Sequence, residues 1–151
     1  NLSFKDHALL PDGQKVVILW KDKLQIYDLC TKSIIYQEKM AASSNTIYYL
    51  HLSLFLDITL NHNGSALAIC KESDISIFSL NFGLNQPLFK RINKILASSP
   101  NQKFICVRAA KHKTDLLAYL TRNEATNTVA VSVKDIKRDK VKTIYEIQSN
   151  L

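Results

Sequence analysis

The sequence is poor in the residues that most nucleotide-binding and disulfide-rich proteins need. Its 151 residues include three glycines, three prolines, three cysteines and one tryptophan. Gly13, Gly64 and Gly83 lie too far apart to form a phosphate-binding loop or a dinucleotide fingerprint. The cysteines are odd in number and each lies in or beside an apolar run, so we expect free thiols in a reducing compartment. No apolar run approaches the roughly 20 residues of a membrane-spanning helix.

Catalytic and metal-binding patterns are also scarce. His7, His51, His62 and His112 have no cysteine or carboxylate at ligand spacing, and no Gly-x-Ser-x-Gly motif occurs. Cys106 and His112 are near enough in sequence to form a nucleophilic pair, but burial of Cys106 in a strand is the better-supported interpretation. Asp57, between two apolar neighbours, is expected at a turn or bulge. We therefore expect no enzyme, no cofactor, no metal site and no small-molecule substrate.

The positive charge is uneven along the chain. Residues 1–60 hold six basic and six acidic side chains, whereas residues 61–151 hold fourteen and seven, which accounts for the net charge of +7. A basic field of this kind attracts polyanions, although a solvated lysine-rich surface that aids solubility is the alternative. The candidate contacts for a polyanion such as RNA are Lys111, Lys113, Lys134, Lys137, Arg138, Lys140 and Lys142.

Short alternating or β-branched runs dominate the rest of the sequence and predict strands. These runs cover residues 16–20, 24–29, 34–36, 66–70, 75–80, 104–107, 116–120, 129–133 and 141–147. The apolar stretch 47–60 is expected in the sheet core, and residues 84–96 have room for a helical turn or two. Clusters of Gly, Asn, Asp and Pro separate the runs and supply turns. The sequence therefore predicts one all-β domain over residues 1–151, and both a β-propeller and an all-β sandwich give strands at such spacing.

An internal repeat supports the prediction of an all-β domain. Residues 10–19 match 61–70 at a constant offset, and residues 23–29 continue the match onto 74–80, with Gly13 falling on Gly64. Both copies contain a turn, an apolar strand, a polar tip and a strand that ends in an aromatic residue. A looser third copy starts at residues 100–102 and continues through strand 103–108, tip 111–115 and strand 116–120.

The repeat units resemble blades of a divergent WD-repeat β-propeller. Leu10-Pro11-Asp12-Gly13 stands where that family has its turn, and Tyr27-Asp28 stands where its signature dipeptide closes a strand. The second copy departs further, with Asn63-Gly64 and Phe78-Ser79 in these places. The resemblance implies blade-like units near residues 4–45, 55–96 and 97–148, which are fewer than the roughly four to eight blades of a closed ring. A longer protein, loops removed from the chain or a partner chain would each explain an incomplete ring.

The resemblance further implies a function in protein–protein interaction. We expect a non-enzymatic scaffold subunit of a large intracellular complex, with a ribosome-biogenesis ribonucleoprotein as the favoured setting and a nuclear or nucleolar location preferred over a cytoplasmic one. A nuclear-pore or vesicle-coat scaffold, and a direct RNA-binding module that uses the basic second half, are the alternatives. We expect no membrane insertion. Leu24, Ile26, Ile75 and Ile77 are predicted to face an interface between blades.

Overall fold

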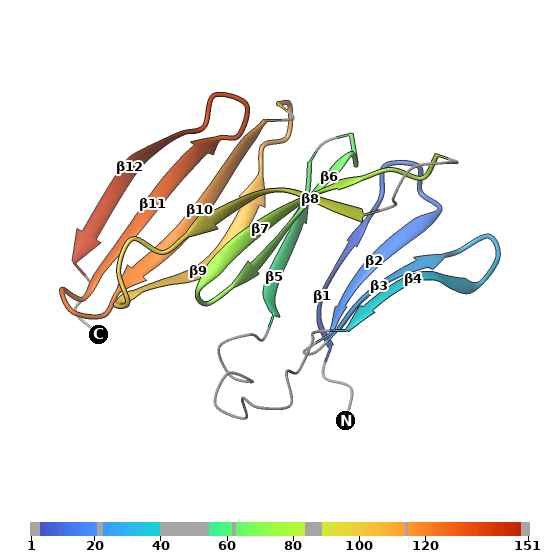
Figure 1. Ribbon diagram of the computed structural model, residues 1–151, viewed down its shortest axis with the longest axis horizontal. Coiled ribbons are helices and arrows are strands. Elements are labelled where there is room, and N and C mark those ends of the chain that lie inside the picture. The colour runs from blue at the N-terminus through green and yellow to red at the C-terminus, as the bar shows by residue number, and fades with distance from the viewer. Residues whose placement is uncertain are drawn as a thin grey trace.

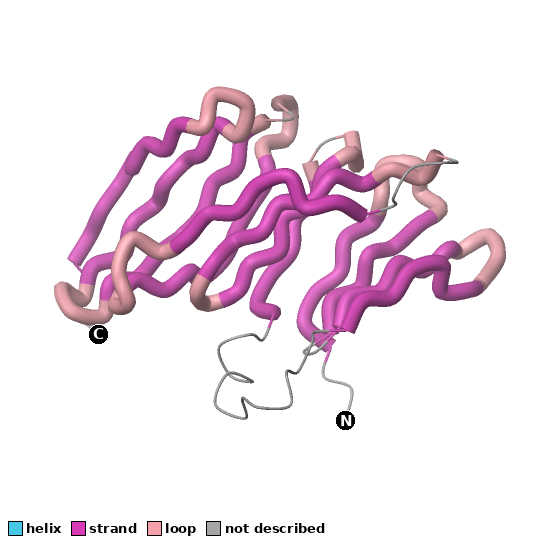
Figure 2. Tube along the Cα trace, viewed as in Figure 1, coloured by secondary structure: helices cyan, strands magenta, loops and turns pink. Residues whose placement is uncertain are grey.

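The structure is a computed structural model that describes residues 4–20, 23–39, 55–61, 63–83, 89–113 and 115–148. Twelve β-strands and no helix occur in these residues (Figure 1, Figure 2). No helix that could cross a membrane is therefore found in the described part of the chain. The prediction of an all-β domain is confirmed.

The strands form three antiparallel sheets of four strands, each sheet built from consecutive strands in sequence order. Sheet 1 contains β1 (Phe4–Leu9), β2 (Lys15–Trp20), β3 (Lys23–Asp28) and β4 (Ser33–Lys39). Sheet 2 contains β5 (Phe55–Leu60), β6 (Ala66–Lys71), β7 (Asp74–Leu80) and β8 (Phe89–Leu96). Sheet 3 contains β9 (Gln102–Ala109), β10 (Leu116–Asn123), β11 (Thr128–Asp135) and β12 (Lys140–Gln148).

The sheets stand side by side like consecutive blades of a propeller. The first strands β1, β5 and β9 lie next to one another, and the remaining strands fan outwards from them (Figure 1). The β1–β2, β3–β4 and β11–β12 links lie at one end of the molecule, together with the described residues of the β5–β6 and β9–β10 links (Figure 1). We call this side the loop end. The expected partial β-propeller is the architecture observed.

The two glycines of the repeat explain the matching turns between first and second strands. Gly13 has φ of 69° and Gly64 has φ of 73°, a backbone region that side chains with a Cβ rarely adopt. Each turn is closed in the same way, because the Gly13 N–H donates to the Leu10 carbonyl and the Gly64 N–H to the Asn61 carbonyl. The repeat in the sequence is therefore a repeat of local structure.

The sequence-based strand assignments hold over all nine runs, but the sequence did not predict β1 or β8. The expected helical turn within residues 84–96 is wrong where the structure describes this segment, since β8 occupies residues 89–96. Lys90, Arg91 and Lys94 lie on this outermost strand, where much of the surface faces solvent, so alternation of apolar residues is weak. Of the stretch 47–60, only β5 lies within the described residues.

The third sequence copy is shifted by one strand relative to the true repeat. In sheets 1 and 2 the turn of the repeat joins the first and second strands, whereas residues 100–102 precede β9, which is a first strand. The equivalent turn in sheet 3 is the 110–115 loop. There the Ala110 N–H donates to the Leu116 carbonyl, as Leu10 does to Lys15 in sheet 1. This loop lacks a glycine, so its sequence does not resemble the other two turns.

Two hydrophobic cores hold the three sheets together, one on each face of sheet 2. The first core joins sheets 1 and 2 and contains Leu10, Val17, Leu19, Leu24, Ile26, Ile58, Leu67, Ile69 and Leu80. The second core joins sheets 2 and 3 and contains Ala68, Cys70, Ile75, Ile77, Ile95, Phe104, Val107, Leu117 and Tyr119. The prediction for the four interface residues is confirmed, since Leu24 and Ile26 lie in the first core and Ile75 and Ile77 in the second.

Candidate interaction surfaces

Sheet 1 has one covered face and one open face, and the internal repeat shows what the open face lacks. At the constant offset of 51 residues, Val16 corresponds to Leu67 and Ile18 to Ile69. Leu67 and Ile69 are 0% and 3% exposed because they pack against sheet 1. Val16 and Ile18 point away from sheet 2, on the face opposite Val17, and are only partly buried. The same repeat positions are therefore buried in sheet 2 and uncovered in sheet 1.

The open face of sheet 1 is apolar and runs across all four strands. We define it by seven large side chains, namely Phe4, Leu9, Val16, Ile18, Trp20, Tyr27 and Ile34. Four of them form one row, because Leu9 pairs with Val16, Val16 with Tyr27, and Tyr27 with Ile34. Such a row of cross-strand neighbours is the surface that a second sheet packs against.

Three polar side chains on this face, those of Trp20, Gln25 and Gln37, bond to one another. The Trp20 indole N–H donates to the Gln25 side-chain oxygen at 2.8 Å, and the Gln25 amide donates to Gln37 at 2.6 Å. Gln25 is accordingly 7% exposed although it lies on the open face. A partner sheet could cover these side chains without leaving their hydrogen-bonding groups unsatisfied.

Sheet 3 also has an open apolar face. A bulge shared by all three sheets identifies the positions in sheet 3 that correspond to those in sheets 1 and 2. The third and fourth strands of each sheet have a register shift at the same place, after Ile26 in sheet 1, Ile77 in sheet 2 and Val131 in sheet 3. Val131 therefore corresponds to Ile26 and Ile77, which are 0% and 1% exposed. Val131 is only partly buried because the described part of the chain forms no fourth sheet to cover it.

A tyrosine occupies equivalent positions on the fourth strands of sheets 1 and 3. Tyr36, opposite Ile26, packs its ring 5.3 Å from that of Phe89 in the next sheet. Tyr145 holds the same place opposite Val131 and is 58% exposed. We define the open face of sheet 3 by the apolar side chains Ala118, Leu120, Val129, Val131, Val133, Tyr145 and Ile147.

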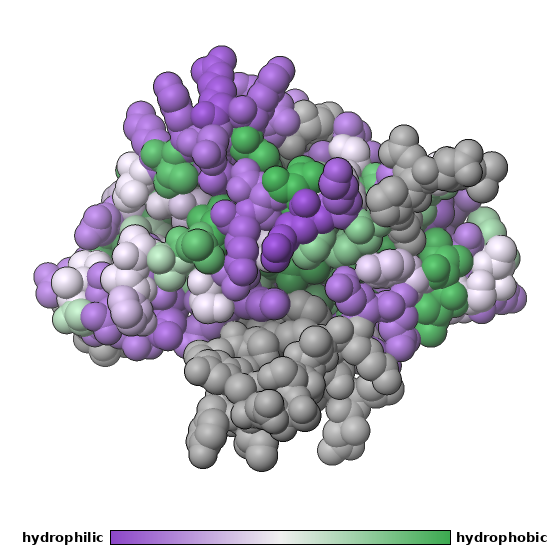
Figure 3. Space-filling model, in the orientation of Figure 1, coloured by the Kyte–Doolittle hydropathy of each residue, from purple (hydrophilic) through white to green (hydrophobic). Residues whose placement is uncertain are grey.

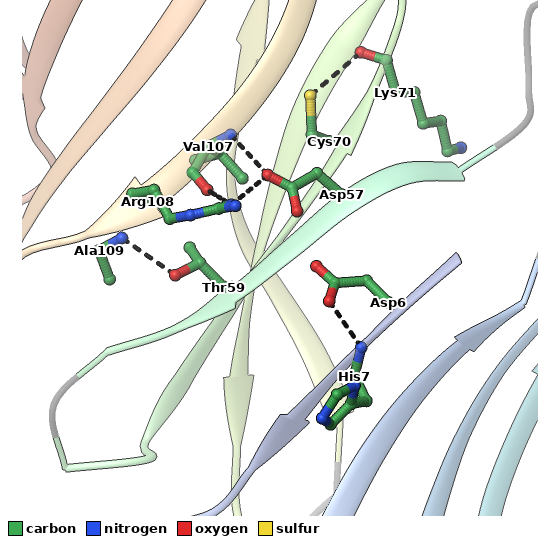
Figure 4. A network of polar contacts seen from close by, with 9 residues as sticks. All are labelled: Asp6, His7, Asp57, Thr59, Cys70, Lys71, Val107, Arg108 and Ala109. Carbon is green, nitrogen blue, oxygen red and sulfur yellow. Dashed lines mark hydrogen bonds and ion pairs between the residues drawn. The ribbon is translucent and has the colours of Figure 1, made fainter. Parts of the chain in front are cut away.

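Polar contacts join the first strands of sheets 2 and 3 (Figure 4). The Asp57 carboxylate accepts the Val107 N–H at 3.0 Å and a hydrogen bond from the Arg108 guanidinium, and the Thr59 hydroxyl accepts the Ala109 N–H at 3.0 Å. Asp57 lies beside a register shift in β5, which agrees with the expected bulge. These bonds satisfy backbone donors of β9 that no neighbouring strand pairs.

Asp57 is also close to a second carboxyl, that of Asp6, its equivalent at the offset of 51 residues. Burial raises the pKa of Asp57, and a hydrogen bond with Asp6 raises it further, against the opposite effects of Val107 and Arg108. Sequence analysis missed this contact between sheets, although extending the repeat upstream from residue 10 would have aligned the two aspartates.

The predicted polyanion contacts separate into three groups. Lys111 and Lys113 lie in the 110–115 loop and Lys137 and Arg138 in the turn between β11 and β12, all exposed at the loop end. In Figure 3 hydrophilic side chains gather over the loop end of sheet 3. The two loops share a hollow of about 450 Å³, which Lys113, Lys137 and Arg138 help to line.

The other predicted contacts lie on strands β11 and β12. Lys140 and Lys142 are exposed on the edge strand β12. Lys134 is 7% exposed, and its ammonium group lies 2.8 Å from the Asp139 carboxylate. The structure thus brings six of the seven residues to an exposed surface and holds Lys134 in an ion pair.

The described residues give little support to catalysis. Within them, no cluster of three or more His, Cys, Asp or Glu side chains is placed to hold a metal ion. His51 and His62 lie outside the described residues. Burial raises the pKa of Cys70 to about 12 and also raises the pKa of Cys106, whereas a nucleophilic cysteine needs a lowered pKa.

Comparison with known proteins gives one kind of match. No family model and no curated protein matches the sequence. Among solved structures, the chain is similar to the β-propeller domain of Cps50 (Swd1) from Myceliophteria thermophila, with 16% identity and a TM-score of 0.68. The match covers 98% of this chain and 42% of that chain, so this chain spans less than half of the neighbour's length. At this identity the likeness shows the fold alone, and the chain has the fold of a partial β-propeller.

Proposed function

We propose that this chain supplies three blades of a larger β-propeller, whose ring is completed by further β-sheets on the two open faces, and that the completed ring is a protein-interaction scaffold. The observation that carries the proposal is the equivalence between exposed and buried repeat positions. Ile18 repeats the position of Ile69, and Val131 repeats that of Ile26. Each open face therefore carries one half of an interface that the chain builds twice internally.

The number of blades supports the same conclusion. Closed propellers have about four to eight blades, and each sheet in the ring covers one face of each of its two neighbours. Sheets of the kind seen here, with matching apolar rows, are the occupants that fit the two open faces. The scaffold is proposed as non-enzymatic, with surface loops and sheet edges rather than a reactive site as its working parts.

In its finer form the proposal concerns a large intracellular assembly that contains RNA. We propose a ribosome-biogenesis ribonucleoprotein, in the nucleus or nucleolus, as the setting. The excess of basic residues after residue 60 supports this choice. A nuclear-pore or vesicle-coat scaffold is the alternative, and there the basic charge would have no partner to bind.

Self-association of the purified chain tests the scaffold proposal, because copies with open apolar faces will cover them with one another. We expect sedimentation to show association that is stronger with rising protein concentration and that persists from about 50 to about 500 mM salt. Ile18→Asp and Val131→Asp should each weaken it. A chain that stays monomeric at all concentrations, or whose association disappears in salt, would contradict apolar docking.

A further inference from the structure

The loop end of sheet 3 concentrates cations from two separate loops. We define the basic cluster as Lys111, Lys113, Lys137, Arg138 and Lys140, with His112 between the first two. Lys113, Lys137 and Arg138 line one hollow of about 450 Å³ between the 110–115 loop and the β11–β12 turn, and Lys111 and Lys140 each lie two residues from one of them in the sequence. All six are exposed.

The backbone beneath the basic cluster is fixed by hydrogen bonds. The Ile136 N–H donates to the Asp115 carbonyl at 2.8 Å and joins the two loops. The Arg138 N–H donates to the Asp135 carboxylate at 3.1 Å, and Asp139 pairs with buried Lys134. The carboxylates of Asp135 and Asp139 therefore stabilise the β11–β12 turn that carries Lys137 and Arg138.

The positive charges of the basic cluster are mostly not neutralised by nearby carboxylates. Among the described residues, Lys111, Lys113 and Lys137 take part in no ion pair, and the Arg138 guanidinium lies 3.8 Å from Asp135. Asp115 and Asp135 line the hollow itself. Their carboxylates would repel a compact anion seated against them, whereas Lys113 and Lys137, which line the same hollow and are more exposed, attract an anion that passes over it.

The cations also continue beyond the hollow. Lys140 and Lys142 point to the same side of β12, because they are two residues apart, and lie roughly 7 Å from each other along the strand. A chain of cations that runs from two loops onto a strand suits a ligand with repeated negative charges better than a single phosphate group. The aromatic side chain next along this side, Tyr145, belongs to the open face of sheet 3.

We propose that the basic cluster binds the phosphate backbone of single-stranded RNA, with no preference for base sequence. Phosphate contacts by lysine and arginine give affinity but carry no sequence information, whereas sequence preference needs contacts to base edges. The inference deepens the proposed ribonucleoprotein setting and rests on it. The 110–115 loop and the β11–β12 turn contain none of the residues that define the open faces, so either proposal can fail alone.

Fluorescence anisotropy with a labelled oligouridylate of about 20 nucleotides tests the inference on the full chain. The test variant carries Lys113→Gln and Lys137→Gln, and the matched control carries Lys5→Gln and Lys32→Gln, which remove the same charge from sheet 1. Loss of two phosphate contacts should lower the slope of log affinity against log salt by about 1.4. Over one decade below 1 M salt, this slope corresponds to affinity about 25-fold weaker at 0.1 M.

Three results would overturn the inference. The control variant could lose as much affinity as the test variant, which would mean a diffuse effect of net charge. The test variant could bind as the wild type does. An oligoglutamate of equal charge could displace the RNA at equal or lower concentration, which would mean that the cluster binds acidic protein segments instead.

Lysine acetylation followed by mass spectrometry gives a second measurement that needs no variant. Bound oligouridylate should protect Lys113 and Lys137 from acetylation and leave Lys5 unchanged. Lys134 should react slowly in both states because it is buried and paired. Equal protection of Lys5 and Lys113 would contradict a site at the loop end. If RNA fails to bind while self-association persists, the blade proposal stands and the RNA inference fails.

Discussion

Sheet 2 and its two neighbours are built from the same repeat, yet their faces have different environments. Both faces of sheet 2 lie in a hydrophobic core, whereas sheets 1 and 3 each bury one face only. Ile69 in sheet 2 is 3% exposed, and its equivalent Ile18 in sheet 1 is partly exposed. Burial of a repeat position therefore depends on the neighbouring sheet as much as on the residue itself.

This difference has an energetic consequence. Full burial of an isoleucine or leucine side chain contributes about 1.5–3 kcal/mol relative to exposure. The open faces of sheets 1 and 3 each carry seven apolar side chains that gain only part of this contribution in the chain alone. Further blades would supply the rest, which is the physical reason to expect that the ring is completed.

The largest expected effect is the difference in stability between one substitution made at equivalent positions in sheets 1 and 2. Ile69→Asp should cost at least about 4 kcal/mol of folding free energy, because an unpaired charge would replace a well-packed side chain between sheets 1 and 2. Ile18→Asp, at the same repeat position, should cost about 1 kcal/mol or less in the monomer. Urea denaturation of both variants measures the difference. Equal losses would show that Ile18 is already part of a complete core.

A smaller effect is expected at the contact between first strands. Asp57→Ala should destabilise the chain by about 1–3 kcal/mol, because the Val107 N–H and the Arg108 guanidinium lose their acceptor. Asp6→Ala is the matched control and should cost less, since Asp6 accepts the exposed N–H of His7 next to it. Thermal unfolding compares the two. A larger loss of stability for Asp6→Ala would show that Asp6, rather than Asp57, makes the more stabilising contact.

Glycine substitutions sharpen the comparison of the two turns. Both glycines have positive φ, so alanine should cost about 1–2 kcal/mol at either position. At Gly64 an added Cβ would also lie 2.7 Å from the Pro11 ring of sheet 1, whereas nothing lies within 4 Å at Gly13. Gly64→Ala should therefore be the more damaging of the two by denaturant titration. Equal costs would mean that the two turns do not press against each other.

The smallest expected effect is on the pH dependence of stability. The folded state raises the pKa of Asp57 above its ordinary value of 3.8, so the folded chain binds a proton more tightly than the unfolded chain. This tighter proton binding stabilises the folded chain fully below pH 3.8, and the stabilisation decreases as the pH rises through the pKa of Asp57 in the folded chain. Relative to Asp57→Asn, the wild type should lose stability over this range. A gain over the same range would show that pairing with Arg108 dominates.

The sequence was sufficient for the fold where local signals were strong. Alternating runs gave nine strands, and the turn glycines aligned two blades, because φ above zero restricts the residue type. β8 was missed because its polar residues suit an outer strand, and the third repeat was placed one strand too early because residues 110–115 make the same turn without glycine.

The candidate surfaces were harder to predict from the sequence. The lysine-rich segments were visible, but the burial of Lys134 against Asp139 depends on the turn that comes after β11. The open faces could not be separated from core strands, because Val16 and Leu67 have the same apolar character and differ only in which sheet lies beside them. Contacts between blades join residues far apart in sequence, and local patterns do not encode which sheet packs on which.

Amide hydrogen exchange at low and high protein concentration tests the central claim most directly, since it reports on each strand separately. The account predicts that association adds protection to peptides from β2 and β3 and from β10 and β11, while β6 and β7 stay unchanged. Protection that does not change with concentration, or that increases only in residues 110–115 and 136–139, would contradict the claim that sheets 1 and 3 present unfinished blade interfaces.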